Sequence, residues 1–404
     1  MNAPILSALK INLPTQAGAL ETFVLSEPRA HPETASGAFN RIAFSAAHVV
    51  ADARAANDPW IDCSLDWDRT IAYREYLWGL GLGVAEAMDT AQRGMGLDWP
   101  TSLELIKRAV AASKTWSARQ GRPALIASGC GTDQLDLGQV DAGKAHSIDD
   151  VIRAYEEQMA AIEKAGGRLI IMASRALARV ARSPDDYERV YDRLLAQARE
   201  PVIIHWLGEM FDPMLAGYWG SVDHHAAMHV ALSVINAHAA KVDGVKISLL
   251  DKEKEIVMRR QLAKGVRMYT GDDFNYALLI AGDEAGYSDA LLGIFDAIAP
   301  AASAALAALA AGDNSTFEAS LAPTVPLSRH IFQAPTRFYK TGVVFMAYLN
   351  GHQDHFVMVG GQQSARSIVH LAQLFRLADR AGLLRDPDMA RRRMVRVLAL
   401  HGIA

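Results

Sequence analysis

From residue 41 onward, short apolar runs alternate with longer amphipathic segments. Runs this short that are rich in Val, Ile, Leu and Gly are typical of strands buried on both faces of a parallel sheet. The segments between most of them have helical spacing of apolar positions. The pattern predicts eight strands, at Ile42–Ala46, Gly81–Met88, Ala124–Gly129, Arg168–Ala173, Pro201–His205, Val242–Leu250, Val266–Thr270 and Ala285–Asp289.

Two intervening segments carry clear helix boundaries. Ser147-Ile-Asp-Asp150 matches a capping box, and its helix is expected to end at Gly166 in an αL C-cap. Ser183-Pro184 is a second helix start. Strands that alternate with helices imply parallel pairing, and eight such units close most simply into a (β/α)8 TIM barrel of the α/β class. An open doubly wound sheet is the rival, but no Gly-rich dinucleotide fingerprint follows the first strand.

The chain outside the barrel pattern divides into two further parts. Residues 1–38 contain scattered prolines and predict an N-terminal arm or small hairpin, and residues 39–300 hold the barrel. Residues 301–404 show no further strand pattern. We expect them to form a helical C-terminal extension packed on the barrel, where it caps the barrel or builds an oligomer interface, with helices at Ala301–Ala311, Thr336–Asn350, Ser364–Gly382 and Pro387–Leu400.

Composition narrows the class of protein. Of 404 residues, 50% are hydrophobic and 21% charged, which is ordinary for a globular protein with a sizeable core. The net charge of −4 argues against a nucleic-acid partner. Two cysteines, Cys63 and Cys130, match neither a disulfide framework nor a zinc spacing. Without a signal-peptide pattern or a membrane-length apolar window, we expect a cytoplasmic protein with no membrane partner.

The sixth predicted strand carries a lysine in its middle. In Val242-Asp-Gly-Val-Lys246-Ile-Ser-Leu-Leu250 the Lys246 side chain has few ways to reach water. A lysine that reaches the strand end or pairs with a carboxylate would explain it without chemistry. Inside a barrel, however, a desolvated ammonium loses its proton more easily, and the free amine attacks a carbonyl. We therefore treat Lys246 as a candidate catalytic residue.

Reacting groups in a (β/α)8 barrel lie at the carboxyl ends of the strands. His205 ends the strand before that of Lys246, and neighbouring strands lie about 4.8 Å apart. Histidine moves protons near neutral pH, as imine chemistry requires, so His205 is the second catalytic candidate. The same rule gives the substrate-binding candidates Glu86, Asp89, Thr90, Ser128, Arg175, Trp206, Asp272, Asp273 and Tyr287.

Some of these residues allow a second interpretation. Asp272 and Asp273 follow Gly271, so one of them is expected to cap the next helix. Glu86, His205 and Asp272 together would provide ligands for a divalent metal. The segment from Gly208 to Gly220, apolar and aromatic between its glycines, is interpreted as a lid over the barrel mouth or as a subunit contact.

Three stretches resemble the dihydrodipicolinate synthase and N-acetylneuraminate lyase family of class I aldolases. Gly244-Val-Lys246-Ile-Ser resembles the family's Gly-Ile-Lys-Glu segment, whose lysine makes the Schiff base. Gly271-Asp-Asp273-Phe resembles its Ser-Gly-Asp-Asp turn. Pro201-Val-Ile-Ile-His205 resembles its fifth strand and places His205 where the family has a catalytic tyrosine. The resemblance implies a TIM barrel, covalent lysine chemistry without a cofactor, a small carbonyl substrate and a homo-oligomer, either dimer or tetramer.

The chain departs from that family where the family binds the carboxylate of a keto acid. The family's Gly-Thr-Thr-Gly-Glu turn is replaced by Glu86-Ala-Met-Asp-Thr90, and Met210 stands near the place of an arginine that follows the tyrosine. Arg175 is the strand-end arginine available to bind an anion. The chain therefore resembles an outlying branch, for which a ketose or other polyol carbonyl is a suitable substrate because carboxylates accept hydrogen bonds from hydroxyls.

Three functions remain open at this point. The first is a Schiff-base-forming lyase or aldolase that acts on a small keto acid or keto sugar. The second is a metal-dependent barrel isomerase, epimerase or hydrolase of a sugar-like substrate, with Glu86, His205 and Asp272 as ligands and Lys246 as an electrostatic helper. The third is a ligand-binding barrel without catalysis.

Overall fold

The computed structural model describes residues 9–32, 34–35, 37–135 and 146–403. The first eight residues of the expected N-terminal arm therefore lie outside the described residues. The strands are β1 Lys10–Pro14, β2 Leu20–Val24, β3 Ala43–Ala46, β4 Gly83–Glu86, β5 Ile126–Cys130, β6 Leu169–Met172, β7 Val202–Leu207, β8 Val242–Ser248, β9 Arg267–Thr270 and β10 Asp289–Leu292.

The helices follow the barrel strands and then continue beyond them. They are α1 Trp67–Gly79, α2 Trp99–Gln120, α4 Ile148–Ala165, α5 Arg175–Val180, α6 Pro184–Gln197, α7 His224–Ala237, α8 Lys252–Arg259, α9 Tyr276–Ala281, α10 Ile294–Ala297, α11 Ala299–Ala310, α12 Asn314–Leu321, α13 Val325–Ile331, α14 Tyr339–Leu349, α15 Ile368–Arg380 and α16 Pro387–Leu400. Short 3-10 turns include η1 Asp89–Ala91 and η6 Thr336–Phe338.

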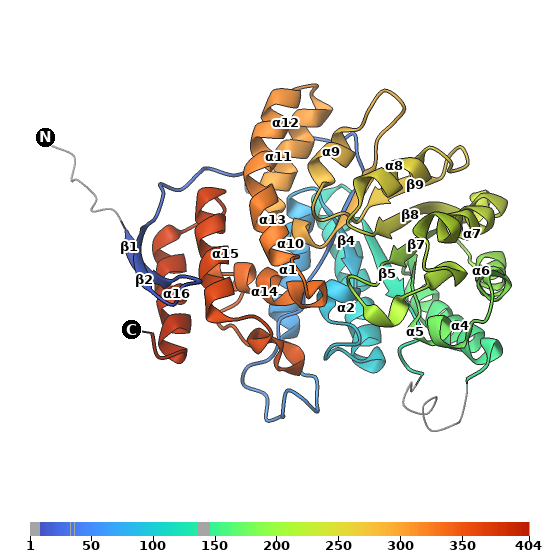
Figure 1. Ribbon diagram of the computed structural model, residues 1–404, viewed down its shortest axis with the longest axis horizontal. Coiled ribbons are helices and arrows are strands. Elements are labelled where there is room, and N and C mark those ends of the chain that lie inside the picture. The colour runs from blue at the N-terminus through green and yellow to red at the C-terminus, as the bar shows by residue number, and fades with distance from the viewer. Residues whose placement is uncertain (1–8, 33, 36, 136–145, 404) are drawn as a thin grey trace, which may run out of the picture.

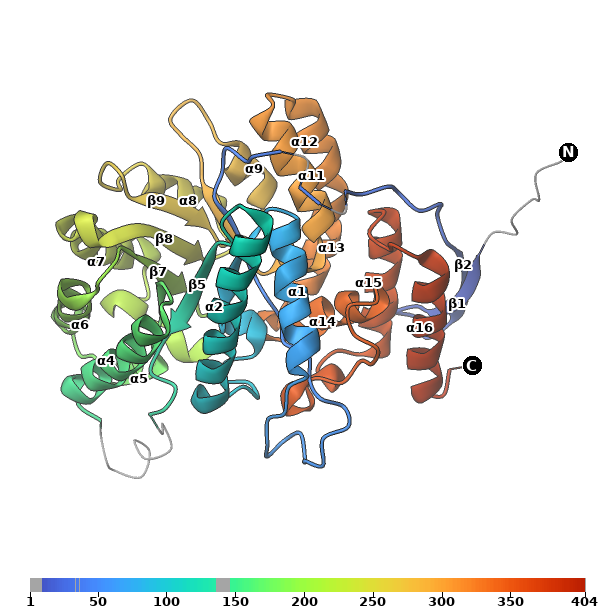
Figure 2. The ribbon, with the colours of Figure 1, turned by 180° about the vertical axis from the view of Figure 1, so that it is seen from behind.

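Strands β3 to β10 form a closed barrel in which every neighbouring pair is parallel. The predicted (β/α)8 barrel is thus confirmed. Its interior is filled by inward-facing side chains such as Phe44 and Tyr269, from the strands on either side of β10, whose rings meet edge to face at 6.1 Å. Helices such as α1 and α2 cover the outside (Figure 2). Successive strand residues alternate between these two sides.

Local signals set the helix boundaries as the sequence indicated. The side chain of Ser147 accepts a hydrogen bond from Asp150 N–H, and the Asp150 carboxylate accepts one from Ser147 N–H. The capping box therefore satisfies donors that the first turn of α4 leaves free. The helix ends at Gly166, whose φ of 83° is the left-handed conformation expected for its C-cap.

The predicted position of the eighth strand was wrong. The strand is Asp289–Leu292, and residues 285–288 belong to the connection before it. Asp283 and Gly286 form an isolated bridge, and Gly286 has a φ of 141°. The apolar residues that form β10 are followed almost directly by those of α10, so the strand could not be distinguished from the helix by its pattern of apolar residues.

The C-terminal part is helical from α11 to α16, and it includes α12 and α13, which the sequence pattern did not indicate. Helix α11 spans the expected boundary at residue 300, and Ser303 Oγ on it donates to Leu80 O at the end of α1, 2.7 Å away. The β1–β2 hairpin lies against α15 and α16 (Figure 1). The N-terminal hairpin therefore packs on the C-terminal helices.

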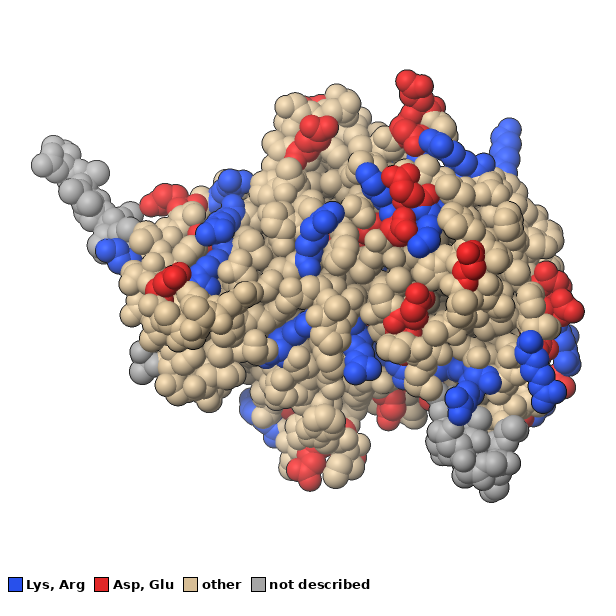
Figure 3. Space-filling model, in the orientation of Figure 1, with Lys and Arg blue, Asp and Glu red and all other residues tan. Residues whose placement is uncertain are grey.

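The visible surface carries mixed charge. Lys and Arg are interspersed with Asp and Glu over the face in Figure 3, without one large basic area. None of the helices in the described ranges is long and apolar enough to cross a membrane.

Candidate active site

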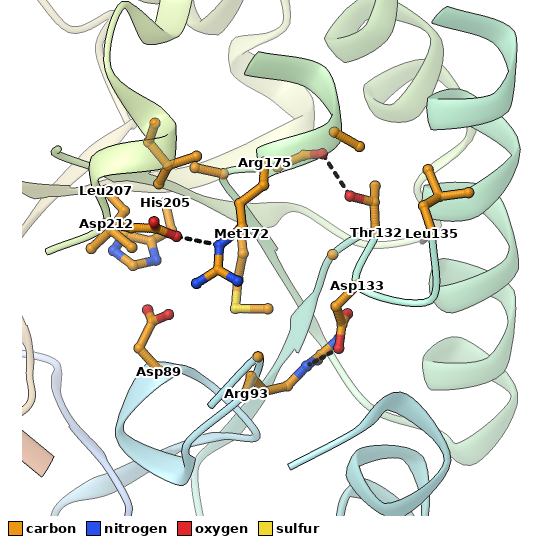
Figure 4. Close-up of a pocket in the computed structure, with 16 residues that line it drawn as sticks. Asp89, Arg93, Thr132, Asp133, Leu135, Met172, Arg175, His205, Leu207 and Asp212 are labelled. Carbon is orange, nitrogen blue, oxygen red and sulfur yellow. Dashed lines mark hydrogen bonds and ion pairs between the residues drawn. The ribbon is translucent and has the colours of Figure 1, made fainter. Parts of the chain in front are cut away.

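A cavity of about 390 Å³ opens at the carboxyl ends of strands β4 to β7. Its walls come from the loops after β4 and β5, the junction of β6 and α5, the end of β7 and the segment that follows β7 (Figure 4). Asp89, Arg175 and His205, three of the predicted site residues, line this cavity. It therefore lies where barrel enzymes place their reacting groups.

Lys246 and His205 are directly paired neighbours on β8 and β7. Lys246 is 7% exposed, and it makes no hydrogen bond or ion pair with any residue that the structure describes. Burial lowers the pKa of its ammonium, and the negative charges of Asp273 and Asp89 oppose that shift. A buried amine without a partner carbonyl or carboxylate is available as a nucleophile.

His205 is fully buried beside this amine. Burial, and after it the positive charge of Lys246, holds the pKa of His205 well below its usual range. The imidazole is therefore neutral at neutral pH. Its Nε2 lies 3.3 Å from Ser248 Oγ, whereas its buried Nδ1 has no hydrogen-bond partner among the described residues. One ring nitrogen is thus left for a ligand.

Gly271 makes room for the lysine. An added Cβ at residue 271 would lie 2.2 Å from Ser248 Oγ and 2.8 Å from Lys246 Cε. Both distances are far below van der Waals contact. In the Gly271-Asp272-Asp273 stretch, the glycine therefore leaves space for the Lys246 side chain, in addition to what the two acids contribute.

The two acids after Gly271 have different roles. Asp272 accepts hydrogen bonds from Phe274 N–H at 2.8 Å, Asn275 N–H at 3.1 Å and the Asn275 side chain at 2.7 Å. These bonds hold the turn before α9, whose N-cap residue is Asn275, so neither acid is the helix cap that the sequence led us to expect. Asp273 accepts from Ile294 N–H at 2.9 Å, and burial raises the pKa of Asp273 to about 7 although nearby Lys246 opposes this shift. Asp273 therefore exchanges its proton in the neutral range.

Asp89 and Thr90 follow β4 and differ in their contacts. The Asp89 carboxylate points into the cavity (Figure 4), and it makes no hydrogen bond or ion pair with a described residue. Thr90 is buried, and its hydroxyl lies 2.8 Å from the hydroxyl of Tyr339 on α14. Asp89 is therefore free to accept ligand hydroxyls, whereas Thr90 joins the barrel to the C-terminal helices.

Three predicted binding residues point away from the cavity. The Glu86 carboxylate accepts two hydrogen bonds from the guanidinium of Arg74 on α1, at 2.8 and 2.9 Å, and a third from the backbone N–H of Ala87 at 2.8 Å. Ser128 is buried on the side of β5 opposite to Ala127, which belongs to the barrel interior. Trp206 packs edge to face on His224 of α7, with ring centroids 6.2 Å apart. Strand alternation directs all three toward the helices.

Tyr287 lies at the other end of the barrel. It precedes β10, is 47% exposed, and stacks under the Arg41 guanidinium 3.4 Å from its ring centre. The wrong position of the eighth strand produced this assignment, and we withdraw Tyr287 as a binding residue.

The three residues considered as metal ligands do not converge. Glu86 faces the helices, Asp272 caps the turn before α9, and His205 alone lines the cavity. In the part of the chain that the structure describes, no three His, Cys, Asp or Glu side chains are grouped as metal ligands would be.

The arginines at the cavity already have acidic partners. Arg175 forms an ion pair with Asp212, and Arg93 forms one with Asp133 (Figure 4). Arg93 also donates to the Gly129 carbonyl at 2.8 Å. Asp212 belongs to the Gly208–Gly220 segment, so that segment contributes to the cavity wall. Neither guanidinium is an unpaired site for an anion.

Sequence analysis missed several residues of this region. Arg93, Asp133 and Asp212 lie in irregular loops, where no periodicity indicates their direction. Lys340 comes from α14, far along the chain, yet it borders a second hollow next to the first. It is the single charged residue in the apolar helix Tyr339–Leu349, a signal of the same kind as Lys246 in its strand.

Comparisons with known proteins give a family and a fold. Residues 11–403 match the model of the family described as "Protein of unknown function (DUF993)", and the chain belongs to this family. No curated protein sequence matches the chain.

Solved structures with the same fold are dihydrodipicolinate synthase family proteins. The enzyme of Aquifex aeolicus has a TM-score of 0.62 and 10% identity, covering 85% of this chain and 99% of its own. That of Oceanobacillus iheyensis has a TM-score of 0.55 and 14% identity, covering 90% and 97%. YagE from E. coli K12, solved in complex with pyruvate, has a TM-score of 0.61 and 14% identity, covering 86% and 100%. The fold resemblance inferred from the sequence is confirmed.

Proposed function

We propose that this member of the DUF993 family is a lyase of the class I aldolase type, which forms a Schiff base between Lys246 and a small carbonyl substrate. The main support is the state of Lys246, a buried amine with a lowered pKa, without a partner among the described residues, and paired across the strands with His205. The fold shared with dihydrodipicolinate synthases agrees with this chemistry.

The first half of the reaction joins substrate and enzyme. Lys246 Nζ attacks the carbonyl carbon, a C–N bond forms, and the carbonyl oxygen takes up a proton to give a carbinolamine. The nitrogen loses one proton, and the hydroxyl leaves as water after a second protonation, which yields the iminium. His205 Nδ1 and Asp273, which lie beside the amine and exchange protons at different pH, are suited to these transfers.

The iminium then acts as an electron sink. Loss of a proton, or cleavage of a C–C bond, at the neighbouring carbon leaves an enamine. Protonation of that carbon and hydrolysis of the imine by water release the product and restore Lys246. The same enamine supports the reverse, bond-forming direction or loss of water next to the carbonyl.

Charge at the cavity favours a keto sugar over a keto acid. Asp89 occupies the turn after β4 with a free carboxylate, which accepts hydrogen bonds from hydroxyls and repels a carboxylate. Arg175 and Arg93 are neutralised by Asp212 and Asp133. We therefore propose a hydroxylated ketone or ketose as substrate.

Exchange of hydrogen in heavy water tests the enamine directly. We expect the protein to exchange the carbon-bound protons of hydroxyacetone or dihydroxyacetone for deuterium, as followed by proton NMR. Lys246→Met should reduce this exchange at least 1000-fold, whereas Lys107→Met, at an exposed position on α2, should not change it. Equal exchange by the wild type and Lys246→Met, or none for any hydroxyketone or keto acid, contradicts the proposal.

A further inference from the structure

A second hollow of about 290 Å³ adjoins the active-site cavity. The two share the side chains of Asp89, Arg175 and Asp212. The outer wall of the second hollow comes from the C-terminal extension, at Arg337 and Lys340. Lys246 lines neither hollow, but its paired neighbour His205 lines the first one. A molecule that enters the first cavity from the second hollow therefore passes residues outside the barrel.

The ammonium of Lys340 is buried without a full set of acceptors. The residue is 5% exposed, and its Nζ contacts the Arg337 carbonyl and Met95 Sδ, each at 3.2 Å. Three N–H donors thus meet one carbonyl and one thioether, which is a weak acceptor. No described carboxylate lies within ion-pair distance of this ammonium. A buried charge with so few partners is costly unless a ligand completes them.

Two cations of the second hollow, Lys340 and Arg337, have no ion-pair partner among the described residues, and Asp89 is the one acid of this hollow that also has none. Arg175 is paired with Asp212, and Arg93 is paired with Asp133. Lys340 and the exposed Arg337 form no ion pair with a described residue. Burial lowers the pKa of Lys340 to about 8, and an anion beside it would raise that pKa again.

We propose that Lys340 and Arg337 form a subsite for the terminal anionic group, a phosphate or a carboxylate, of the substrate whose carbonyl reacts at Lys246. The claim that a substrate uses this subsite rests on the proposed function. The claim that Lys340 and Arg337 bind an anion does not.

The position of Asp89 connects the two ends of such a substrate. Asp89 lines both hollows, and Lys340 lines the second one. The negative charge of Asp89 raises the pKa of both Lys246 and Lys340, against the effect of burial. The proposed substrate is a short chain with its carbonyl at Lys246, beside His205 of the first cavity, its hydroxyls at Asp89, which lines both hollows, and its anion at Lys340 in the second hollow. That order corresponds to a ketose phosphate or a keto sugar acid.

Binding of inorganic phosphate and of acetate to the full-length protein tests the subsite alone. Calorimetry should detect at least one of the two anions with wild type and with Lys107→Met, and binding should weaken at least tenfold in Lys340→Met. Tighter phosphate binding assigns a phosphate terminus, and tighter acetate binding assigns a carboxylate. Absence of binding by wild type, or equal binding by Lys340→Met, overturns the proposal. Thermal unfolding of each variant verifies that it is folded.

A second arm connects the subsite to the reaction. If phosphate is the anion that binds, borohydride trapping on Lys246 should reach half of its maximum at a concentration of dihydroxyacetone phosphate at least tenfold lower than that of dihydroxyacetone. Lys340→Met should remove that preference while leaving dihydroxyacetone trapping within about twofold. Trapping of neither compound, with Lys340-dependent anion binding intact, counts against the lysine chemistry and leaves the anion subsite standing. A preference unchanged by Lys340→Met counts against the subsite.

Discussion

Lys246, His205 and Asp273 are buried, and Asp89 lines the adjoining cavity, so the charges of Asp89 and Asp273 act on Lys246, and the charge of Lys246 acts on His205, with little screening by water. Burial favours the uncharged amine and the uncharged imidazole, and the acids oppose the first effect. Burial thus makes the Lys246 ammonium easier to deprotonate, and the neutral His205 does not compete for its proton. Because the charge of one group changes the pKa of its neighbour, a single substitution among them should change the pH dependence of the reaction as well as its rate.

Asp89→Asn should move the acid limb of the trapping reaction to lower pH. The Asp89 charge raises the pKa of Lys246, so its removal lowers that pKa and increases the neutral amine at a given pH. The pH dependence of borohydride trapping with acetone, which has no hydroxyl, measures this effect. A limb that moves to higher pH, or stays in place, contradicts the electrostatic contact between Asp89 and Lys246.

A second buried acid controls stability away from the site. Burial raises the pKa of Glu255 to about 8, although hydrogen bonds from Ser288 and Thr270 stabilise its charge. Its stabilising effect is therefore complete below its unfolded pKa and is lost as pH rises through about 8.

Glu255→Gln should accordingly stabilise the protein at pH 9, on the order of 2 kcal/mol, with a smaller difference near pH 5. The hydroxyls of Thr270 and Ser288 can rotate to bind the amide. Urea unfolding at both pH values provides the measurement. A variant less stable than wild type at pH 9 would show that the ionised Glu255 carboxylate does not destabilise the folded protein as assumed.

At the scale of the element, strand position and strand face contribute separately to the site. The apolar runs and the strand-end rule correctly placed His205 and Lys246 on neighbouring strands. The same rule included Glu86, Ser128 and Trp206, because it considers distance along a strand and ignores the alternation of faces. Lys340 could not be found this way, since its approach to the cavity depends on how α14 packs on the barrel.

Gly271→Ala tests how strictly the residue after β9 shapes the space for Lys246. The new methyl group would overlap Ser248 Oγ and Lys246 Cε, so we expect imine trapping to fall at least tenfold. Gly79→Ala is the matched control, because a Cβ there meets nothing within 4 Å. Circular dichroism should remain that of the wild type in both. Full trapping by Gly271→Ala would show that the lysine does not need this space.

At the scale of the whole molecule, the β1–β2 hairpin and the C-terminal helices are packed together beside the barrel. The hairpin β1–β2 packs on the C-terminal helices, and those helices provide Tyr339 and Lys340 to the mouth of the barrel. The sequence predicted a helical extension on the barrel. It did not predict which of these helices contact the hairpin or the barrel mouth, because contacts between residues hundreds of positions apart leave no periodic pattern in the sequence. The homo-oligomer and the division at residues 38 and 300 stay predictions.

Arg376→Met should loosen the hairpin without reaching the cavity. Arg376 on α15 donates to the carbonyls of Leu13 and Pro14 at 3.1 and 3.2 Å. Their loss should cost about 2 kcal/mol of unfolding free energy. Amide exchange should quicken in residues 10–24, and trapping at Lys246 should stay within twofold. Unchanged exchange in the hairpin would contradict this anchoring role.

The central claim is that Lys246 bonds covalently to a carbonyl substrate. Purified protein is treated with sodium borohydride in the presence of dihydroxyacetone or pyruvate, digested, and mapped by mass spectrometry. We expect reduction of the iminium to leave a stable secondary amine on Lys246, with a higher yield for dihydroxyacetone and with the same adduct in Lys107→Met. An adduct on Lys340 in place of Lys246, or no adduct with any carbonyl compound, would contradict the account.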